Sequence, residues 1–259
     1  RARPSGFILD RKIAVSQGTG RFAYPSASKA VAIWELSSAS TEPTQVGEIQ
    51  TKGASHSFDI SHDGRWLATT TSGELVIWDT ETGKPWKAGE GVGNVNQVTD
   101  IVRFRPTGEL VHAFHGSLTD TAPLTPAHPV RGGPVTYAES AWVRVYKPGP
   151  WRLAKDWGDG DFPDQLQKSV VNTKEFLQGN ATIFGDAATS PDGRWLALGS
   201  GLARTGESTV WLWHWKQKKL VGQLRLGSHD GVTRLVFSPS SRLLAIGRYG
   251  GGVWLAQVP

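Results

Sequence analysis

Cysteine and methionine are both absent from the 259 residues of this chain. Without cysteine the protein can form no disulfide, no thiolate metal site and no cysteine nucleophile, and the compartment stays open, with the cytoplasm favoured. No apolar run approaches the roughly eighteen residues of a membrane-spanning helix, and residues 1–6 lack the apolar core of a secretion signal. Because no initiator methionine is present, we expect a processed product or a piece of a longer protein.

Motifs for enzyme chemistry are also missing. The sequence has no Gly-x-Ser-x-Gly elbow, no phosphate-binding loop and no His-Glu-x-x-His pattern, so we predict a protein that is not an enzyme and has no cofactor. The acidic run at residues 156–164 lacks the spacing and the closing glutamate of a calcium loop. We therefore interpret this run as a solvated turn and predict no metal site.

The excess of positive charge is small. Lys and Arg number 28 against 23 Asp and Glu, which gives a formal net charge of +5, and the basic residues are scattered along the chain. A dedicated nucleic-acid-binding protein usually concentrates its basic residues in one stripe, so nucleic acid is disfavoured as a partner. The net charge favours acidic partners instead.

Residues that favour turns and strands are abundant. The chain contains 31 Gly and 15 Pro, which punctuate it with turns, and 12 Trp with 9 Phe, which are bulky and favour strands. This composition favours an all-β fold. The length is typical of one all-β domain, so we predict a single domain over residues 1–259.

A short pattern recurs along the chain, in which a strand, a tight turn and a second strand follow one another. Its clearest copies are Ser-His-Asp-Gly-Arg-Trp-Leu-Ala at 61–68 and Ser-Pro-Asp-Gly-Arg-Trp-Leu-Ala at 190–197, with weaker copies at 18–23, 105–110 and 238–245. The turn glycine or its counterpart falls at Gly20, Gly64, Gly108, Gly193 and Ser241. The successive intervals are 44, 44, 85 and 48 residues, and three of these fit one propeller blade of roughly 40–45 residues.

An alternating strand that ends in an aromatic residue follows each of these turns. The aromatic residues are Trp34, Trp78, Tyr146, Trp213 and Trp254. Trp78-Asp79 is the dipeptide that names the WD-repeat family, and the chain resembles that family from about residue 11 to residue 257. The resemblance implies a β-propeller, a ring of four-stranded sheets. It also implies a non-catalytic protein-interaction scaffold or sensor module within a larger complex or multidomain protein.

Five blades are predicted, and a sixth inside the 85-residue interval is the alternative. The five are centred on residues 11–50, 56–87, 98–157, 184–226 and 232–257. The last blade lacks an obvious fourth strand, and Phe7-Ile8-Leu9 is an apolar stretch without a partner. We expect this N-terminal strand to complete the last blade and close the ring, which would leave no open sheet edge. Missing blades supplied by a longer parent chain are a further alternative.

Two long insertions interrupt the repeats, at residues 117–140 and 158–182. Loops longer than about twelve residues within a compact domain are usually functional or disordered. We predict that these insertions and neighbouring loops on the same face form a surface that binds a protein partner. The residues predicted for this surface are Arg131, Trp157, Phe162, Arg204, Arg248 and Tyr249. Tolerated surface padding is the alternative interpretation of both insertions.

A second functional hypothesis places a small ligand, a metal or a reaction in the central channel of the propeller. The first strands of the blades supply the candidate channel-lining residues Asp59, Asp100, Asp186 and Arg234. The wall of any propeller channel must be polar, so these residues do not by themselves identify a ligand.

Overall fold

The computed structural model describes residues 13–27, 29–39, 41–51, 53, 57–71, 74–86, 96–117, 140–147, 152–157, 184–201, 207–228 and 230–259. All the regular structure of these residues is β-strand, arranged in five antiparallel sheets. The strands, sheet by sheet, are β1 (Ala14–Val15), β2 (Arg21–Ala27), β3 (Ala30–Glu35) and β4 (Thr44–Gln50); β5 (Ser57–Ile60), β6 (Trp66–Thr71) and β7 (Glu74–Asp79); β8 (Asn96–Phe104), β9 (Leu110–Ser117), β10 (Ser140–Lys147) and β11 (Arg152–Trp157); β12 (Phe184–Thr189), β13 (Trp195–Ser200), β14 (Glu207–His214) and β15 (Lys219–Ser228); β16 (Val232–Phe237), β17 (Leu243–Arg248) and β18 (Val253–Gln257).

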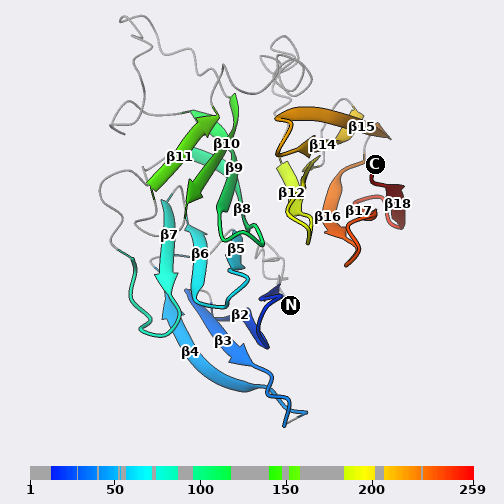
Figure 1. The fold of residues 1–259 in the computed structure, drawn as a ribbon. Coiled ribbons are helices and arrows are strands. Elements are labelled where there is room, and N and C mark those ends of the chain that lie inside the picture. Colours follow the sequence, from blue (N-terminus) through cyan, green and yellow to red (C-terminus); the bar gives the residue numbers. More distant parts are fainter. Residues whose placement is uncertain are drawn as a thin grey trace, which may run out of the picture.

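The five sheets follow one another around a common centre (Figure 1), as the blades of a propeller do. Each sheet is a meander of consecutive strands, and the first strands contact one another in the order β1, β5, β8, β12 and β16. The prediction of an all-β propeller with five blades is confirmed for the described residues. Phe7-Ile8-Leu9, which we expected to close the ring, lies outside them, as do residues 118–139, 148–151 and 158–183 of the 85-residue interval in which a sixth blade was the alternative.

The recurring turn between the first and second strand of a sheet is built by a serine and an aspartate. The backbone N–H of Ser190 donates to the carbonyl of Trp195, while Asp192 Oδ1 accepts from Ser190 Oγ at 2.6 Å and from Arg194 N at 3.0 Å. Gly193 has a φ of 69°, a left-handed conformation that glycine adopts without strain. The same bonds recur around Ser61, so the repeated sequence codes for a repeated hairpin.

The first copy of this turn is displaced by one residue from the prediction. Ser16 N donates to the carbonyl of Arg21, which is the counterpart of the bond from Ser61 N to Trp66. Thr19, and not Gly20, therefore stands where Gly64 stands in the second copy.

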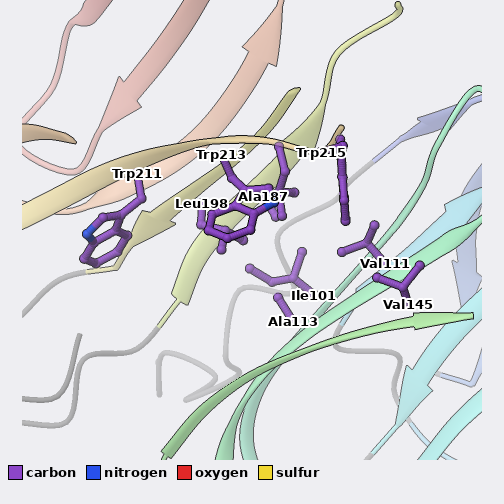
Figure 2. Packing of buried hydrophobic residues seen from close by; sticks show 10 residues of the cluster. Ile101, Val111, Ala113, Val145, Ala187, Leu198, Trp211, Trp213 and Trp215 are labelled. Carbon is purple, nitrogen blue, oxygen red and sulfur yellow. The ribbon is translucent and has the colours of Figure 1, made fainter. Parts of the chain in front are cut away.

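Apolar clusters fill the space between successive sheets. Between the third and fourth sheets, the indoles of Trp211, Trp213 and Trp215 form one apolar cluster with Ile101 and Val145 (Figure 2). Trp211 and Trp213 are each only 1% exposed. Because both faces of a blade pack against neighbours, its strands carry apolar residues on both sides, unlike the strands of a sheet with one solvated face.

Candidate functional site

The first strands of the five sheets surround a cavity of about 440 Å³. Residues of the turns that follow four of these strands also line it, namely Gln17, His62, Pro106 and Pro191. The charged side chains that line the cavity are Asp59, Arg103, Arg105, Asp186 and Arg234. The wall of the cavity is therefore mixed, with apolar side chains beside charges of both signs.

Three of the predicted channel residues, Asp59, Asp186 and Arg234, lie on this wall. Asp100 lies in β8 opposite Phe114, and its side chain is outside the described part of the chain. The sequence reasoning missed Arg103 and Arg105. Their signal was an Arg-x-Arg pair at the end of a predicted first strand.

Asp59 connects the second sheet to the third. Its Oδ2 atom accepts a hydrogen bond of 2.7 Å from the backbone N–H of Phe104. Burial raises the pKa of Asp59 to about 6, against the opposing effects of the Arg103 guanidinium and of two backbone N–H groups. This carboxyl group therefore changes its protonation state close to neutral pH.

Asp186 connects the fourth sheet to both of its neighbours. Its side chain is fully buried, and Oδ1 accepts a hydrogen bond from Arg103 Nη2 in the third sheet. Oδ2 accepts from the backbone N–H of Leu235 in the fifth sheet at 2.9 Å and lies 4.0 Å from Arg234 Nη1. A buried carboxylate needs such partners because an unpaired buried charge is costly.

Arg103 spans the same boundary with its Nε donor as well, while its Nη1 bonds within β8. Nε donates to the carbonyl of Ala187 and Nη1 to the carbonyl of Val102, each at 2.7 Å. Arg234 differs, because its side chain is 39% exposed whereas that of Arg103 is 15% exposed. Arg234 is therefore the more accessible of these two cations on the cavity wall.

Hydrogen bonds of this kind join the first strand of one sheet to side chains of the preceding sheet. The N–H groups of Val102, Phe104 and Leu235 lie on the edge of β8 or β16 that pairs with none of the described strands. Each donates to a side chain of the preceding sheet, Val102 to Ser57 Oγ at 3.2 Å and the other two to the carboxylates. A buried backbone N–H without an acceptor is destabilising, so these contacts join neighbouring blades.

A second polar group lies at the opposite end of the fifth sheet, and we name it the Tyr249 cluster: Asp230, Arg248, Tyr249 and Trp254. Arg248 pairs with Asp230, and its guanidinium carbon lies 4.4 Å from the centre of the Trp254 ring. Tyr249 is 66% exposed and Trp254 is 38% exposed. The cluster thus presents two aromatic side chains beside a fixed arginine.

Asp230 holds the cluster together. Its Oδ1 atom accepts from the N–H groups of Gly231 at 2.9 Å and Gly250 at 3.1 Å. Burial acts to raise the pKa of Asp230, but these two N–H groups and Arg248 outweigh it and hold the pKa below its usual value. The carboxylate therefore stays ionised and keeps Arg248 in place.

The other residues predicted for the partner surface are not described in full. Arg131, Phe162 and Arg204 lie outside the described residues, as do residues 118–139 and 158–182 of the two insertions. Trp157 ends β11 opposite Val143, and its side chain is not described. The structure thus shows the predicted surface only at Arg248 and Tyr249.

The described residues show neither a metal-binding cluster nor a membrane-spanning helix. No group of three or more His, Asp or Glu side chains in this part of the chain is arranged to hold a metal ion. The same residues include no helix with the length and apolar composition needed to cross a membrane.

Comparison with known proteins gives likeness of fold only. No protein-family model and no curated protein sequence matches the chain. Among solved structures, the chain is similar to the β-propeller domain of Cps50 (Swd1) from Myceliophteria thermophila, with 13% identity and a TM-score of 0.56 over 96% of this chain. It is also similar to hydrazine synthase from Kuenenia stuttgartiensis, with 12% identity and a TM-score of 0.57 over 96% of this chain. The chain spans 65% of the first protein and 59% of the second.

Proposed function

We propose that this chain is a non-catalytic protein-interaction module of the WD-repeat type and that the Tyr249 cluster forms part of its binding surface. The observation that carries the proposal is the exposure of Tyr249 and Trp254 beside an arginine that Asp230 holds in place. Tyr, Trp and Arg are the residues most enriched where binding energy concentrates in protein interfaces. Groups already fixed before binding lose little conformational entropy when a partner docks.

The WD-repeat assignment has support in the second sheet. Trp78 Nε1 donates a buried hydrogen bond of 2.8 Å to Thr69 Oγ1 on the adjacent strand. Asp79 Oδ1 accepts from the N–H groups of Glu81 and Thr82 and so caps the turn that follows. Both residues of the dipeptide therefore make hydrogen bonds that stabilise the blade, as the family resemblance implies.

The non-catalytic part of the proposal is supported by the engagement of the cavity carboxylates. Asp59 and Asp186 both accept hydrogen bonds from the next sheet, and Asp186 also pairs with Arg103. Groups committed to holding blades together are poorly placed to transfer protons to a substrate. The net charge of +5 supports an acidic protein partner for the exposed surface.

The test compares proteins retained by the immobilised full chain with those retained by a Tyr249→Ala, Trp254→Ala double variant. A matched control is Val221→Ala, which removes an apolar side chain, 39% exposed, from β15. We expect a partner that the wild type and the control retain and the double variant loses. Equal retention by all three would contradict the assignment of this surface. Charge reversal at Arg248 is a poorer test, since it would leave Asp230 without its cation.

A variant without residues 117–140 is a separate arm of the same experiment. If the insertion contributes to the predicted surface, its removal weakens retention of the same partner. Undiminished retention would favour the interpretation of the insertion as surface padding.

A small ligand in the cavity is the second candidate function. The observation that favours it is that Arg234, with its 39% exposed side chain, and Asp59, with a pKa of about 6, line the same 440 Å³ space. A guanidinium recognises carboxylates through paired hydrogen bonds, so a small carboxylate fits this wall. Thermal-shift screening of small carboxylates tests the idea. It predicts a stabilising compound whose effect is lost in Arg234→Gln, and no stabilisation by any carboxylate contradicts it.

A further inference from the structure

Each sheet of the propeller has two faces, and a face is buried where another sheet packs against it. We call the face toward the next sheet along the chain the forward face and the opposite one the back face. On the forward face of the fourth sheet, Ala188, Trp195 and Val210 are 7%, 4% and 3% exposed, and all three pack against the fifth sheet. These side chains define what a paired forward face looks like in this protein.

The forward face of the fifth sheet carries the counterparts of these residues, and they are exposed. Equivalent turn bonds and strand register align Ala188 with Val236, Trp195 with Leu243 and Val210 with Val253; the same register aligns Leu212 with Leu255. The exposed fractions are 54% for Val236, 40% for Leu243, 65% for Val253 and 71% for Leu255. Side chains suited to an interface between blades thus face solvent at this end of the chain.

The back face of the first sheet shows the matching feature. Ile13 and Val15 correspond to Phe58 and Ile60 of the second sheet, because Ser16 and Ser61 make the same turn bond. Phe58 and Ile60 are 4% and 3% exposed, whereas Ile13 and Val15 are 55% and 60% exposed.

The aromatic residues of this back face follow the same rule. Phe22 and Trp34 pair across β2 and β3 as Leu67 and Trp78 pair across β6 and β7. The rings of Phe22 and Trp34 stack with their centres 6.4 Å apart. Leu67 and Trp78 are buried, whereas Phe22 and Trp34 are only half-buried. The chain therefore carries one forward face and one back face that are not covered by its described residues.

We propose that these two faces bind each other between two copies of this chain, the fifth sheet of one copy packing on the first sheet of the next. All four contacts between sheets within the chain join a forward face to a back face, so the proposed contact continues an interface the molecule already uses. A second copy necessarily carries the cognate face. Contacts of this head-to-tail kind form a closed ring if the rotation between copies closes, and an open chain of copies if it does not.

The experiment measures the mass of the full chain in solution by analytical ultracentrifugation across micromolar concentrations. Two variants block one face each: Leu255→Asp on the forward face and Val15→Asp on the back face. The wild type is expected to form multiples of 28.0 kDa, and each variant alone to associate at least about tenfold more weakly, because a charge replaces an apolar side chain that the proposed contact buries. An equimolar mixture of the two variants is expected to form a dimer, since the intact back face of one meets the intact forward face of the other.

A third variant, Val221→Asp, places a charge on the exposed part of β15 and is expected to associate as the wild type does. Circular dichroism is the check that all variants keep the β fold, and because Leu255 and Val15 are exposed we expect them to do so. A wild type that is monomeric at every concentration overturns the proposal, as does a mixture of the two variants that stays monomeric. A monomer whose melting temperature falls by many degrees when residues 1–10 are deleted would instead show that the chain closes its own ring.

Discussion

Replacing Asp59 by Asn should stabilise the protein near neutral pH and change little near pH 4. The pKa of Asp59 is raised from its usual value of 3.8 to about 6 because burial penalises the charged form. Below about pH 3.8 the carboxyl group is protonated in both the folded and the unfolded chain. As the pH rises from there to about 6, the unfolded chain loses this proton first, so the folded state loses stability; above about pH 6 the loss is complete.

The size of the effect follows from the same shift. A difference of about 2 pKa units corresponds to about 3 kcal/mol, and because Asp59 is only partly buried by accessible surface we expect about 1–3 kcal/mol. The Asn oxygen can still accept the hydrogen bond from Phe104 N, so the contact between the second and third sheets is kept.

The assay is urea unfolding of the wild type and Asp59→Asn at about pH 4 and at about pH 7.5. The variant should gain stability over the wild type only at the higher pH. Glu81→Gln, at an exposed carboxylate after β7, is the control and should show no such gain. A variant that is less stable than the wild type at about pH 7.5, or a difference that does not depend on pH, would refute the reasoning.

Three further substitutions test the packing of the blades. Asp186→Ala leaves Arg103 without its carboxylate in a buried position and should cost about 3–5 kcal/mol in urea unfolding, whereas a loss under about 1 kcal/mol would contradict the role of this pair. Trp211→Ala empties a site that is 1% exposed between the third and fourth sheets and should cost about 3–5 kcal/mol in the same assay. Gly185→Ala would place a Cβ atom 1.9 Å from a backbone carbonyl oxygen of β16 and should lower stability by about 1–3 kcal/mol. Gly222→Ala is the control, because a Cβ atom at Gly222 would make only ordinary contacts. Equal melting temperatures for the two variants would argue against the close approach at Gly185.

The blades could be predicted because the residues that repeat in the sequence are those that make the hairpin turn. Ser61, Asp63 and Gly64 hydrogen-bond among themselves and with the next residues of the chain, so the pattern survives as a short local motif. The first turn was misplaced by one residue because Gly20 resembles Gly64 in type, although Thr19 occupies its structural position. The turn motif could therefore be predicted from the sequence, but the exact position of the turn in a degenerate copy could not.

The cavity could be predicted only in part. Asp59 and Asp186 were chosen as equivalent positions, yet Asp59 stands two residues before Ser61 whereas Asp186 stands four before Ser190. Each nevertheless accepts a hydrogen bond from an N–H group of the next sheet. Arg103 was missed because its partner, Asp186, is 83 residues away and belongs to another blade. Pairings between blades leave no trace in the spacing of a single repeat.

The uncovered faces of the first and fifth sheets could not have been read from the sequence either. Val15 and Val253 are apolar residues in strands like many others, and nothing in the sequence distinguishes them from buried counterparts such as Ile60 and Val210. Only the arrangement of sheets shows which strand faces have a neighbour.

Hydrogen exchange of two backbone amides, followed by NMR, tests most directly the claim that neighbouring blades are joined through the cavity carboxylates. The N–H groups of Phe104 and Leu235 lie on strand edges that pair with no strand in the described part of the chain, and they donate hydrogen bonds to Asp59 and Asp186 instead. We predict that both exchange slowly in the wild type, that Asp59→Ala accelerates exchange at Phe104 alone, and that Asp186→Ala accelerates it at Leu235. Exchange of both amides at the rate of an unfolded chain in the wild type would contradict the account.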